Sequence, residues 1–311
     1  MDAKEFDLII IGAGPAGCSA AVYGKRGGLN LLMLGGAYPG GQLLLTNEVE
    51  NYPGFEIISG AEIIDKMHKQ LSRLGVEITK EDVAKIEKND NHFIVTSKNG
   101  SVYKALAVIA ATGARARWLG APGESKYRGK GVSACATCDG FFFRGKEVCV
   151  VGGGNTALED ALFLTHFAPK VHLIHRREGF RAEAATVQKV KENPKIQIHV
   201  NFVVDEILGD GEAVTGIRIK SVKEENKSEN IDCKGVFIAV GYVPVTDVFK
   251  NAGVDLYDDG HIKTDARSRT NIRGLYAAGD CADPLYHQAI VAAGSGAKAA
   301  IEAVNFVNLC K

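Results

Sequence analysis

The sequence predicts an α/β protein made of two βαβ modules, with the second module inserted into the first. Two glycine-rich turns, Gly12-Ala13-Gly14-Pro15-Ala16-Gly17 and Gly152-Gly153-Gly154-Asn155-Thr156-Ala157, each follow an apolar strand and precede a helical segment. The last part of the chain does not continue the second module but forms its own strand, turn and helix. A length of 311 residues suits two domains better than a single core.

The first module begins with an expected strand at 6–11, a helix at 16–26 and a strand at 29–34. Gly27 and Gly28 end that helix. Helical periodicity at 61–74 and strand-like segments at 93–97 and 101–111 follow. Together these segments predict a parallel sheet with covering helices.

The second module repeats this order. We expect strands at 147–151 and 170–174, a helix at 157–165 between them, and a helix at 183–192 that ends at Asn193-Pro194. Further strands are expected at 196–202, 216–222 and 235–240. A strand at 275–280 and a long helix at 286–307 close the chain. Gly and Pro cluster near 115–123 and 241–246, so we expect one domain of 1–116 with 246–311, and an inserted domain of 117–245.

Composition argues against several classes of partner. Lys plus Arg and Asp plus Glu are equal at 37 each, so no overall charge attracts nucleic acid or membrane. The N-terminus does not resemble a signal peptide, and no apolar run reaches the ~20 residues that span a bilayer. Seven cysteines are odd in number and too few for a disulfide scaffold. We therefore expect a cytoplasmic protein, with five isolated thiols as small buried hydrophobes: Cys18, Cys149, Cys233, Cys281 and Cys310.

The first glycine turn predicts a nucleotide site. Glycines let the backbone approach a pyrophosphate at a helix N-terminus, where free N–H groups favour an anion. The acidic residue that usually holds the ribose is absent, because Leu34-Gly35-Gly36 ends the next strand. This module alone leaves NAD and FAD as alternatives.

The second glycine turn favours NADPH over NADH. About 20 residues beyond it, where an NAD site offers a carboxylate, the chain has His175-Arg176-Arg177, with Arg181 one helical turn further. Guanidinium groups bind a 2′-phosphate through charge-assisted hydrogen bonds.

Between the two turns lies the pair Cys135-Ala136-Thr137-Cys138, followed by Asp139. Three interpretations apply: a zinc site, two inert thiols or a redox disulfide. No second CxxC or HxxxH supplies further zinc ligands, which favours the redox pair. A cysteine must lose its proton to attack a disulfide, and Asp139 is the candidate acid or base.

In these motifs the chain resembles the low-molecular-weight bacterial thioredoxin reductases, which belong to the class II pyridine nucleotide-disulfide oxidoreductases. The likeness runs from Phe6 to the last helix. Besides the two turns, the cysteine pair and the arginines, it includes Pro39-Gly40-Gly41-Gln42, Glu48 to Gly54, Ala111-Thr112-Gly113, Gly279-Asp280 and His287-Gln288-Ala289.

The resemblance implies two Rossmann-like domains and a homodimeric flavoenzyme that passes a hydride from NADPH to FAD, reduces its own disulfide and then reduces thioredoxin. It implies that Cys138 lies next to the flavin and that Cys135 attacks the substrate. The inserted domain would rotate about the two joints. The implied FAD residues are Gly12, Gly14, Pro15, Ala16, Gly35, Gly41, Gln42, Leu43, Asn51, Val83, Ala111, Thr112, Gly113, Gly279, Asp280, His287, Gln288 and Ala289. The implied NADPH residues are Gly152, Gly154, Asn155, Thr156, Ala157, His175, Arg176, Arg177 and Arg181.

Three rivals share parts of this pattern. A ferredoxin-fed reductase lacks the basic cluster, and a flavin-binding sensor needs only the first module. A dithiol oxidase has a similar fold and is separated by stopped-flow reduction with NADPH. His287 replaces the Arg that is commoner in the family, which bears on the pH dependence of the flavin.

Overall fold

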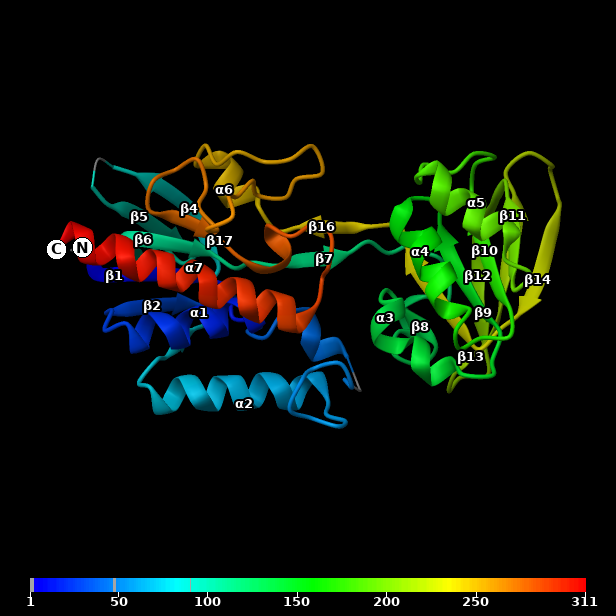
Figure 1. Cartoon of the computed structure of the whole chain (residues 1–311), viewed down its shortest axis with the longest axis horizontal. Coiled ribbons are helices and arrows are strands. Elements are labelled where there is room, and N and C mark those ends of the chain that lie inside the picture. The colour runs from blue at the N-terminus through cyan, green and yellow to red at the C-terminus, as the bar shows by residue number, and fades with distance from the viewer. Residues whose placement is uncertain (1–2, 47–48, 90) are drawn as a thin grey trace. The chain divides into compact units, whose positions relative to one another are not determined.

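The computed structural model describes residues 3–46, 49–89 and 91–311, so Glu48 of the motif above lies outside the described residues. The chain divides into two compact units. Unit 1 combines Met1–Arg115 with Val243–Lys311, and unit 2 is Ala116–Tyr242. The chain passes between them in β7 (Ala114–Ala116) and β16 (Tyr242–Pro244), which pair with each other (Figure 1).

Unit 1 is built on a largely parallel sheet. Its strands, in the order β3-β2-β1-β6-β5-β4 with β17 also on β6, are β3 (Ile78–Thr79), β2 (Leu31–Leu34), β1 (Lys4–Ile11), β6 (Val102–Ala110), β5 (Phe93–Ser97), β4 (Val83–Lys88) and β17 (Leu275–Ala277). β6 pairs with β5 along its first half and with β17 along its second. The second half of β1 is apolar and buried, as expected for a central parallel strand.

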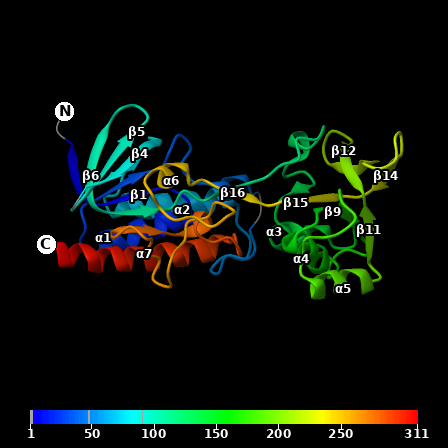
Figure 2. The ribbon, with the colours of Figure 1, turned by 90° about the horizontal axis from the view of Figure 1, so that it is seen from above.

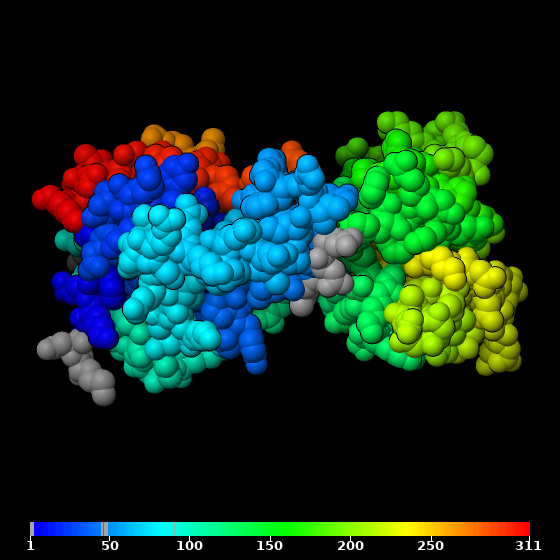
Figure 3. Space-filling view, turned by 90° about the horizontal axis from the view of Figure 1, so that it is seen from below, coloured from blue at the N-terminus to red at the C-terminus, as the bar shows by residue number. Residues whose placement is uncertain are grey.

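Helices cover this sheet. They are α1 (Pro15–Arg26), α2 (Gly60–Arg73), α6 (Asp247–Asn251) and α7 (Ala289–Cys310), with the short 3₁₀ helices η1 (Gln42–Leu45) and η4 (Gly279–Cys281). α7 runs along α1 in two views (Figures 1 and 2). A Cβ at Gly296 would overlap the Ala16 carbonyl, so the two helices meet backbone to backbone. Ser59 and Glu62 form a capping box at the start of α2, which lies at the surface in Figure 3.

α7 is long and apolar enough to cross a membrane by length and composition alone. It contains Lys298 and Glu302, so its apolar run is interrupted. Ala299, Ala300 and Ala303 have no exposed surface and belong to the core that α7 shares with α1 and β6. The apolar composition is that of a core helix.

Unit 2 contains a parallel sheet in the order β11-β10-β9-β15-β8, formed by β11 (Ile196–Val200), β10 (Val171–His175), β9 (Val148–Gly152), β15 (Gly235–Ala239) and β8 (Val132–Ser133). An antiparallel sheet of β12 (Phe202–Gly209), β13 (Val214–Ser221) and β14 (Ser228–Asp232) packs beside it. The helices are η2 (Ser125–Tyr127), α3 (Ala136–Asp139), η3 (Gly140–Phe143), α4 (Asn155–Leu164) and α5 (Ala184–Glu192). The prediction of an α/β protein with two βαβ modules is confirmed.

Two predicted elements differ from the structure. The strand expected at 196–202 is two strands, because Asn201 adopts the left-handed region at φ 64° and turns the chain between β11 and β12. The last helix begins at Ala289 rather than at 286, because His287 has φ 47° and Gln288 is extended. The sequence also missed β4 and β14, whose residues are largely exposed.

A buried pair of histidines links β10 and β11 of unit 2 to Glu147, which directly precedes β9. His172 Nδ1 lies 3.1 Å from His199 Nε2, and His172 Nε2 lies 3.1 Å from the carboxylate of Glu147. The two imidazoles are 4% and 8% exposed. Burial lowers the pKa of His172, and burial together with the charges of His172 and Lys170 lowers the pKa of His199 to about 4.

This pair predicts acid-sensitive stability. The unfolded chain binds a proton at each histidine below about pH 6.5, whereas the folded chain does not. The free energy of unfolding should therefore fall as the pH drops from about 6.5 toward about 4, by up to about 1.4 kcal/mol per pH unit for the imidazole of His199, and the lowered pKa of His172 adds to this fall. In urea titrations at several pH values, His199→Gln should lessen this slope. The exposed His166→Gln serves as the control, and equal slopes in His199→Gln and the parent would contradict the expectation.

Candidate redox and nucleotide sites

The first glycine turn is closed on one side by the protein backbone. A Cβ at Gly12, which has φ 117°, would overlap the carbonyl oxygen of Ala111, and one at Gly17 would overlap the carbonyl of Gly12. The N–H of Gly12 donates to Leu34 O at 2.8 Å. These positions require glycine because the end of β6 and the start of α1 press against the turn.

The other side of the turn is open. A Cβ at Gly14 would meet only Gly40 O at 3.6 Å, and one at Gly41 would meet only Gly14 Cα at 3.7 Å. Gly14 is the N-cap of α1, and within the described residues no side chain caps this helix end. Two facing glycines therefore border a space next to a helix N-terminus whose first-turn N–H groups suit an anion.

Two predicted flavin residues meet although they are 237 positions apart. Asn51 Nδ2 donates to Gln288 Oε1 at 3.2 Å, and Gln288 is the N-cap of α7. The chain between 279 and 289 holds this end of α7 in place, since Gly279 N donates to Ser295 Oγ at 2.8 Å. Burial and the charge of Asp283 together raise the pKa of Asp280 to about 6.

The remaining predicted flavin residues lie in unit 1 around the ends of its strands. Thr112 Oγ1 donates to Val245 O at 2.5 Å, and Gly113 has φ 68° with nothing near its missing Cβ. A Cβ at Gly35 would meet the side chain of Ile78 at 2.6 Å. The starts of α1 and α7 are flanked by Pro15, Ala16, Ala111, Gly279 and Ala289. The helix η1 contains Gln42 and Leu43, and β4 begins at Val83.

The cysteine pair of unit 2 is a disulfide between Cys135 and Cys138, with Cα atoms 5.3 Å apart. Cys135 is the N-cap of the single-turn helix α3. Its N–H donates to Ser133 Oγ at 3.0 Å, and Thr137 Oγ1 lies 3.4 Å from its sulfur. Tyr242 donates its hydroxyl to Ala134 O at 2.8 Å. Sequence reasoning missed Ser133 and Tyr242, because neither lies in the CxxC motif.

Asp139 follows the disulfide directly and its N–H donates to Cys135 O at 3.2 Å. Burial raises the pKa of Asp139, and a hydrogen bond from Ser133 opposes that rise. A carboxyl group with a raised pKa keeps its proton closer to neutral pH, so it can serve as a proton donor there.

The second glycine turn, like the first, is packed against the protein on one side and open on the other. A Cβ at Gly152 would overlap Ala239 O, and one at Gly153 would overlap the ring of His175, whereas nothing lies near a Cβ at Gly154. Gly154 is the N-cap of α4, again with no side-chain cap among the described residues. Asn155 Oδ1 accepts from Glu183 N at 2.8 Å, while Thr156 is exposed and Ala157 is buried.

The basic residues after β10 separate into two kinds. His175 is 6% exposed, stacks on Phe180 with ring centroids 5.2 Å apart, and has Nε2 3.1 Å from Gly179 O. Burial and the charges of the neighbouring arginines lower the pKa of His175, so it is a neutral support under the turn. Arg176, Arg177 and Arg181 are exposed, and none pairs with a carboxylate of the described residues within 4 Å.

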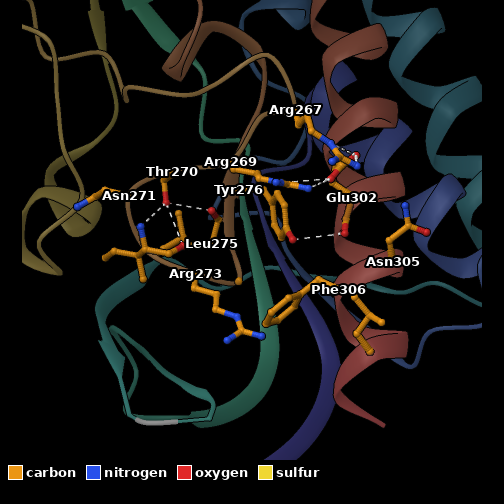
Figure 4. Close-up of a pocket in the computed structure, with 13 residues that line it drawn as sticks. Arg267, Arg269, Thr270, Asn271, Arg273, Leu275, Tyr276, Glu302, Asn305 and Phe306 are labelled. Atoms are coloured by element: carbon orange, nitrogen blue, oxygen red, sulfur yellow. Dashed lines mark hydrogen bonds and ion pairs between the residues drawn. The ribbon is translucent and has the colours of Figure 1, made fainter.

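A separate cavity of about 550 Å³ lies in unit 1 between the 267–276 segment and α7 (Figure 4). Glu302 holds Arg267 and Arg269 at 2.9 Å each, and the guanidinium of Arg273 lies 5.5 Å from the ring of Phe306. None of the predicted cofactor residues lines this cavity among the residues that the structure describes. We therefore assign it no part in the redox site.

The chain matches a family model described as pyridine nucleotide-disulphide oxidoreductase over residues 6–296. Thioredoxin reductase of Rickettsia prowazekii (strain Madrid E) is 45% identical over 305 residues, which cover 97% of this chain and 98% of that protein. Thioredoxin reductase of Escherichia coli O157:H7 is 41% identical over 314 residues, covering 98% and 97%. The crystal structure of thioredoxin reductase from Streptococcus pyogenes MGAS5005 has a TM-score of 0.93 and 39% identity, covering 99% of this chain and 100% of that one.

Proposed function

Because this chain belongs to the pyridine nucleotide-disulphide oxidoreductase family, we propose that it is an NADPH-dependent thioredoxin reductase whose working group is the Cys135–Cys138 disulfide. The observation that carries the proposal is this disulfide, which lies in the same unit as a glycine turn followed by three arginines. A small redox ring beside a dinucleotide turn is what disulfide reduction by a nicotinamide requires.

Unit 1 fits FAD. The space bordered by Gly14 and Gly41 would be filled by a side chain at either position, and it lies at the N-terminus of α1. When bound, FAD carries two electrons from NADPH to the disulfide. Its pyrophosphate is held by Gly12, Gly14, Pro15 and Ala16, and its ribitol is bound by Asp280. Ring contacts come from Gln42, Asn51, His287, Gln288 and Ala289, and Gly35, Gly41, Leu43, Val83, Ala111, Thr112, Gly113 and Gly279 complete the site.

Unit 2 holds NADPH. Gly152, Gly154, Asn155, Thr156 and Ala157 surround its pyrophosphate at the start of α4. The 2′-phosphate is bound by Arg176, Arg177 and Arg181, since their exposed guanidinium groups attract this dianion and form charge-assisted hydrogen bonds with it that the uncharged 2′-hydroxyl of NADH does not allow. His175 supports the turn from below, where a Cβ at Gly153 would meet its ring.

The thiol–disulfide exchange with thioredoxin conserves electrons and atoms without a further oxidant. Reduction of the Cys135–Cys138 disulfide takes two electrons and two protons and yields two thiols. The Cys135 thiolate attacks the substrate disulfide, forms a mixed disulfide and releases one substrate thiolate. The Cys138 thiolate then attacks the Cys135 sulfur, which releases the second substrate thiolate and restores the disulfide. Asp139 supplies and accepts the proton at the cysteine pair.

Four further features stay predictions. The chain forms a homodimer and works in the cytoplasm, where a reducing environment keeps Cys18, Cys149, Cys233 and Cys281 as the buried thiols seen here. The expectation that Cys310 is buried is wrong, because Cys310 is exposed at the end of α7. Neither nucleic acid nor membrane is a partner. Thioredoxin docks near the disulfide, where Phe141 is 47% exposed, whereas Phe143 packs on Phe237 with ring centroids 5.3 Å apart.

Replacing either cysteine of the pair should abolish turnover. We expect Cys135→Ser and Cys138→Ser to lose NADPH-dependent reduction of thioredoxin, because neither variant can form the disulfide, while bound flavin is still reduced by NADPH. Insulin-coupled thioredoxin reduction measures the first effect and anaerobic stopped-flow absorbance the second. Cys310→Ser, which changes an exposed thiol outside the pair, is the control. Full activity in either pair variant would refute the assignment, and reoxidation by oxygen instead of thioredoxin would indicate a dithiol oxidase.

Asp139→Asn should slow thiol–disulfide transfer by about 10²-fold, the lower end for removal of a positioned acid or base. Because burial raises the pKa of Asp139, the parent rate should decline as the pH rises through that pKa, and the variant should lack this decline. Single-turnover reduction of thioredoxin across a pH series measures both effects. Asp232→Asn, an exposed aspartate of β14, is the control. Parallel pH profiles for Asp139→Asn and the parent would show that Asp139 moves no proton.

Loss of the arginines should remove the preference for NADPH. We expect the double substitution Arg176→Ala with Arg177→Ala to raise KM for NADPH by about 10- to 100-fold, which corresponds to about 1.4–2.8 kcal/mol in total for two exposed, water-screened guanidinium groups. KM for NADH should change little because NADH lacks the 2′-phosphate. Steady-state kinetics with both dinucleotides measures the ratio, and Lys189→Ala on the exposed face of α5 is the control. An equal rise for both dinucleotides would place the 2′-phosphate elsewhere.

A further inference from the structure

A histidine that no motif includes is buried in unit 1 beside the proposed flavin residues. His261 is 4% exposed and follows a tight turn in which Tyr257 N donates to His261 O at 2.8 Å. The next residue, Ile262, donates its N–H to Cys281 O at 2.8 Å. The backbone of His261 is therefore held against η4, which contains Asp280.

The ring of His261 is fixed at one end and lacks a hydrogen bond at the other. Nδ1 lies 2.9 Å from the carboxylate of Asp259, whereas Nε2 is buried with no hydrogen-bond partner among the described residues. A buried polar nitrogen without a partner is costly unless a ligand or a neighbouring group completes it. Among the described residues, the protein therefore leaves the hydrogen-bonding capacity of His261 Nε2 unused.

His287 faces His261 across this place. Their ring centroids are 6.0 Å apart at an interplanar angle of 64°. His287 has φ 47°, a conformation that non-glycine residues rarely adopt, and it directly precedes Gln288, which accepts from Asn51. The strained backbone therefore directs the imidazole of His287 from the same segment that holds the proposed flavin contacts.

The charged groups around the two rings are carboxylates. Asp259 lies beside His261. The charges of Asp283 and Asp259 act to raise the pKa of His287. The charge of His261 acts to lower the pKa of Asp280. Burial and the neighbouring His261 lower the pKa of His287. Two imidazoles at this separation repel when both are protonated, whereas a single proton is favoured by the surrounding carboxylates.

We propose that His261 and His287 form a proton-binding pair beside the flavin, which takes up one proton from solvent when the flavin is reduced. This inference rests on the proposed function, because it assumes FAD in unit 1. The two electrons arrive as the hydride of NADPH, and the proton binds one imidazole nitrogen of the pair. No bond between heavy atoms forms or breaks. The added negative charge of reduced flavin provides the driving force for the uptake.

The test is the midpoint potential of the bound flavin, measured by spectroelectrochemistry of the holoenzyme across a pH series. Within the pH window of the pair, one extra proton per two electrons should steepen the dependence by about 30 mV per pH unit, which is a tenfold change in the equilibrium constant. The double variant His261→Gln with His287→Gln should lose this steeper window. His261→Gln alone should keep it but move it along the pH axis, because His287 then titrates without its partner.

His287→Arg gives a second, independent test. A permanently charged group cannot take up the proton, and its charge disfavours protonation of the neighbouring His261, so the steeper window should disappear while the potential at high pH rises. The double variant His92→Gln with His166→Gln changes two histidines outside the pair and should match the parent. Identical slopes in the parent, the double variant and His287→Arg would overturn the proposal. Purified chain without flavin would overturn both the pair and the proposed function, whereas chain that holds FAD but does not reduce thioredoxin would overturn only the proposed function.

Discussion

Backbone-to-backbone contact around α1 is the constraint on which unit 1 depends. Gly12 meets Ala111, Gly17 meets Gly12, and Gly296 meets Ala16, and at each place a methyl group would overlap a carbonyl. These contacts bring the start of α1 to the carboxyl ends of β1 and β6 and bring α7 against α1. Ligands of open α/β sheets bind at this edge, so the same close packing that builds the core also positions the site.

Unit 2 repeats this constraint with different side chains at the strand ends. Gly152 presses on Ala239, and Gly153 rests on the ring of His175. The open position, Gly154, then faces a loop that carries arginines rather than an acid. The same backbone geometry therefore occurs in both units, and under the proposed function the residues after the second strand decide which nucleotide each unit accepts. The disulfide sits on the short helix α3, where Ser133 and Tyr242 bind the N–H and the C=O of the peptide bond that precedes Cys135.

Burial sets the charge state of the groups that the chemistry uses. Asp139 and Asp280 both have raised pKa values because they are removed from water, and both lie at predicted sites. The buried histidines shift in the opposite direction for the same reason, since a low dielectric disfavours whichever form is charged. The arginines after β10 remain exposed, which suits a group that must bind and release a dinucleotide in each cycle.

Local sequence determined the two glycine turns, the strands and helices that flank them and the spacing of the cysteine pair, because each depends on neighbours within a few residues. It also indicated the α/β class and the inserted order, since a second strand–turn–helix pattern restarts the first. Only the tertiary structure decided which distant residues meet: Asn51 with Gln288, His261 with His287, and His172 with His199. It also showed that His175 is a buried support whereas the arginines beside it are exposed. These facts depend on how the chain returns to the sheet edge across long separations, and no local periodicity or propensity encodes that return.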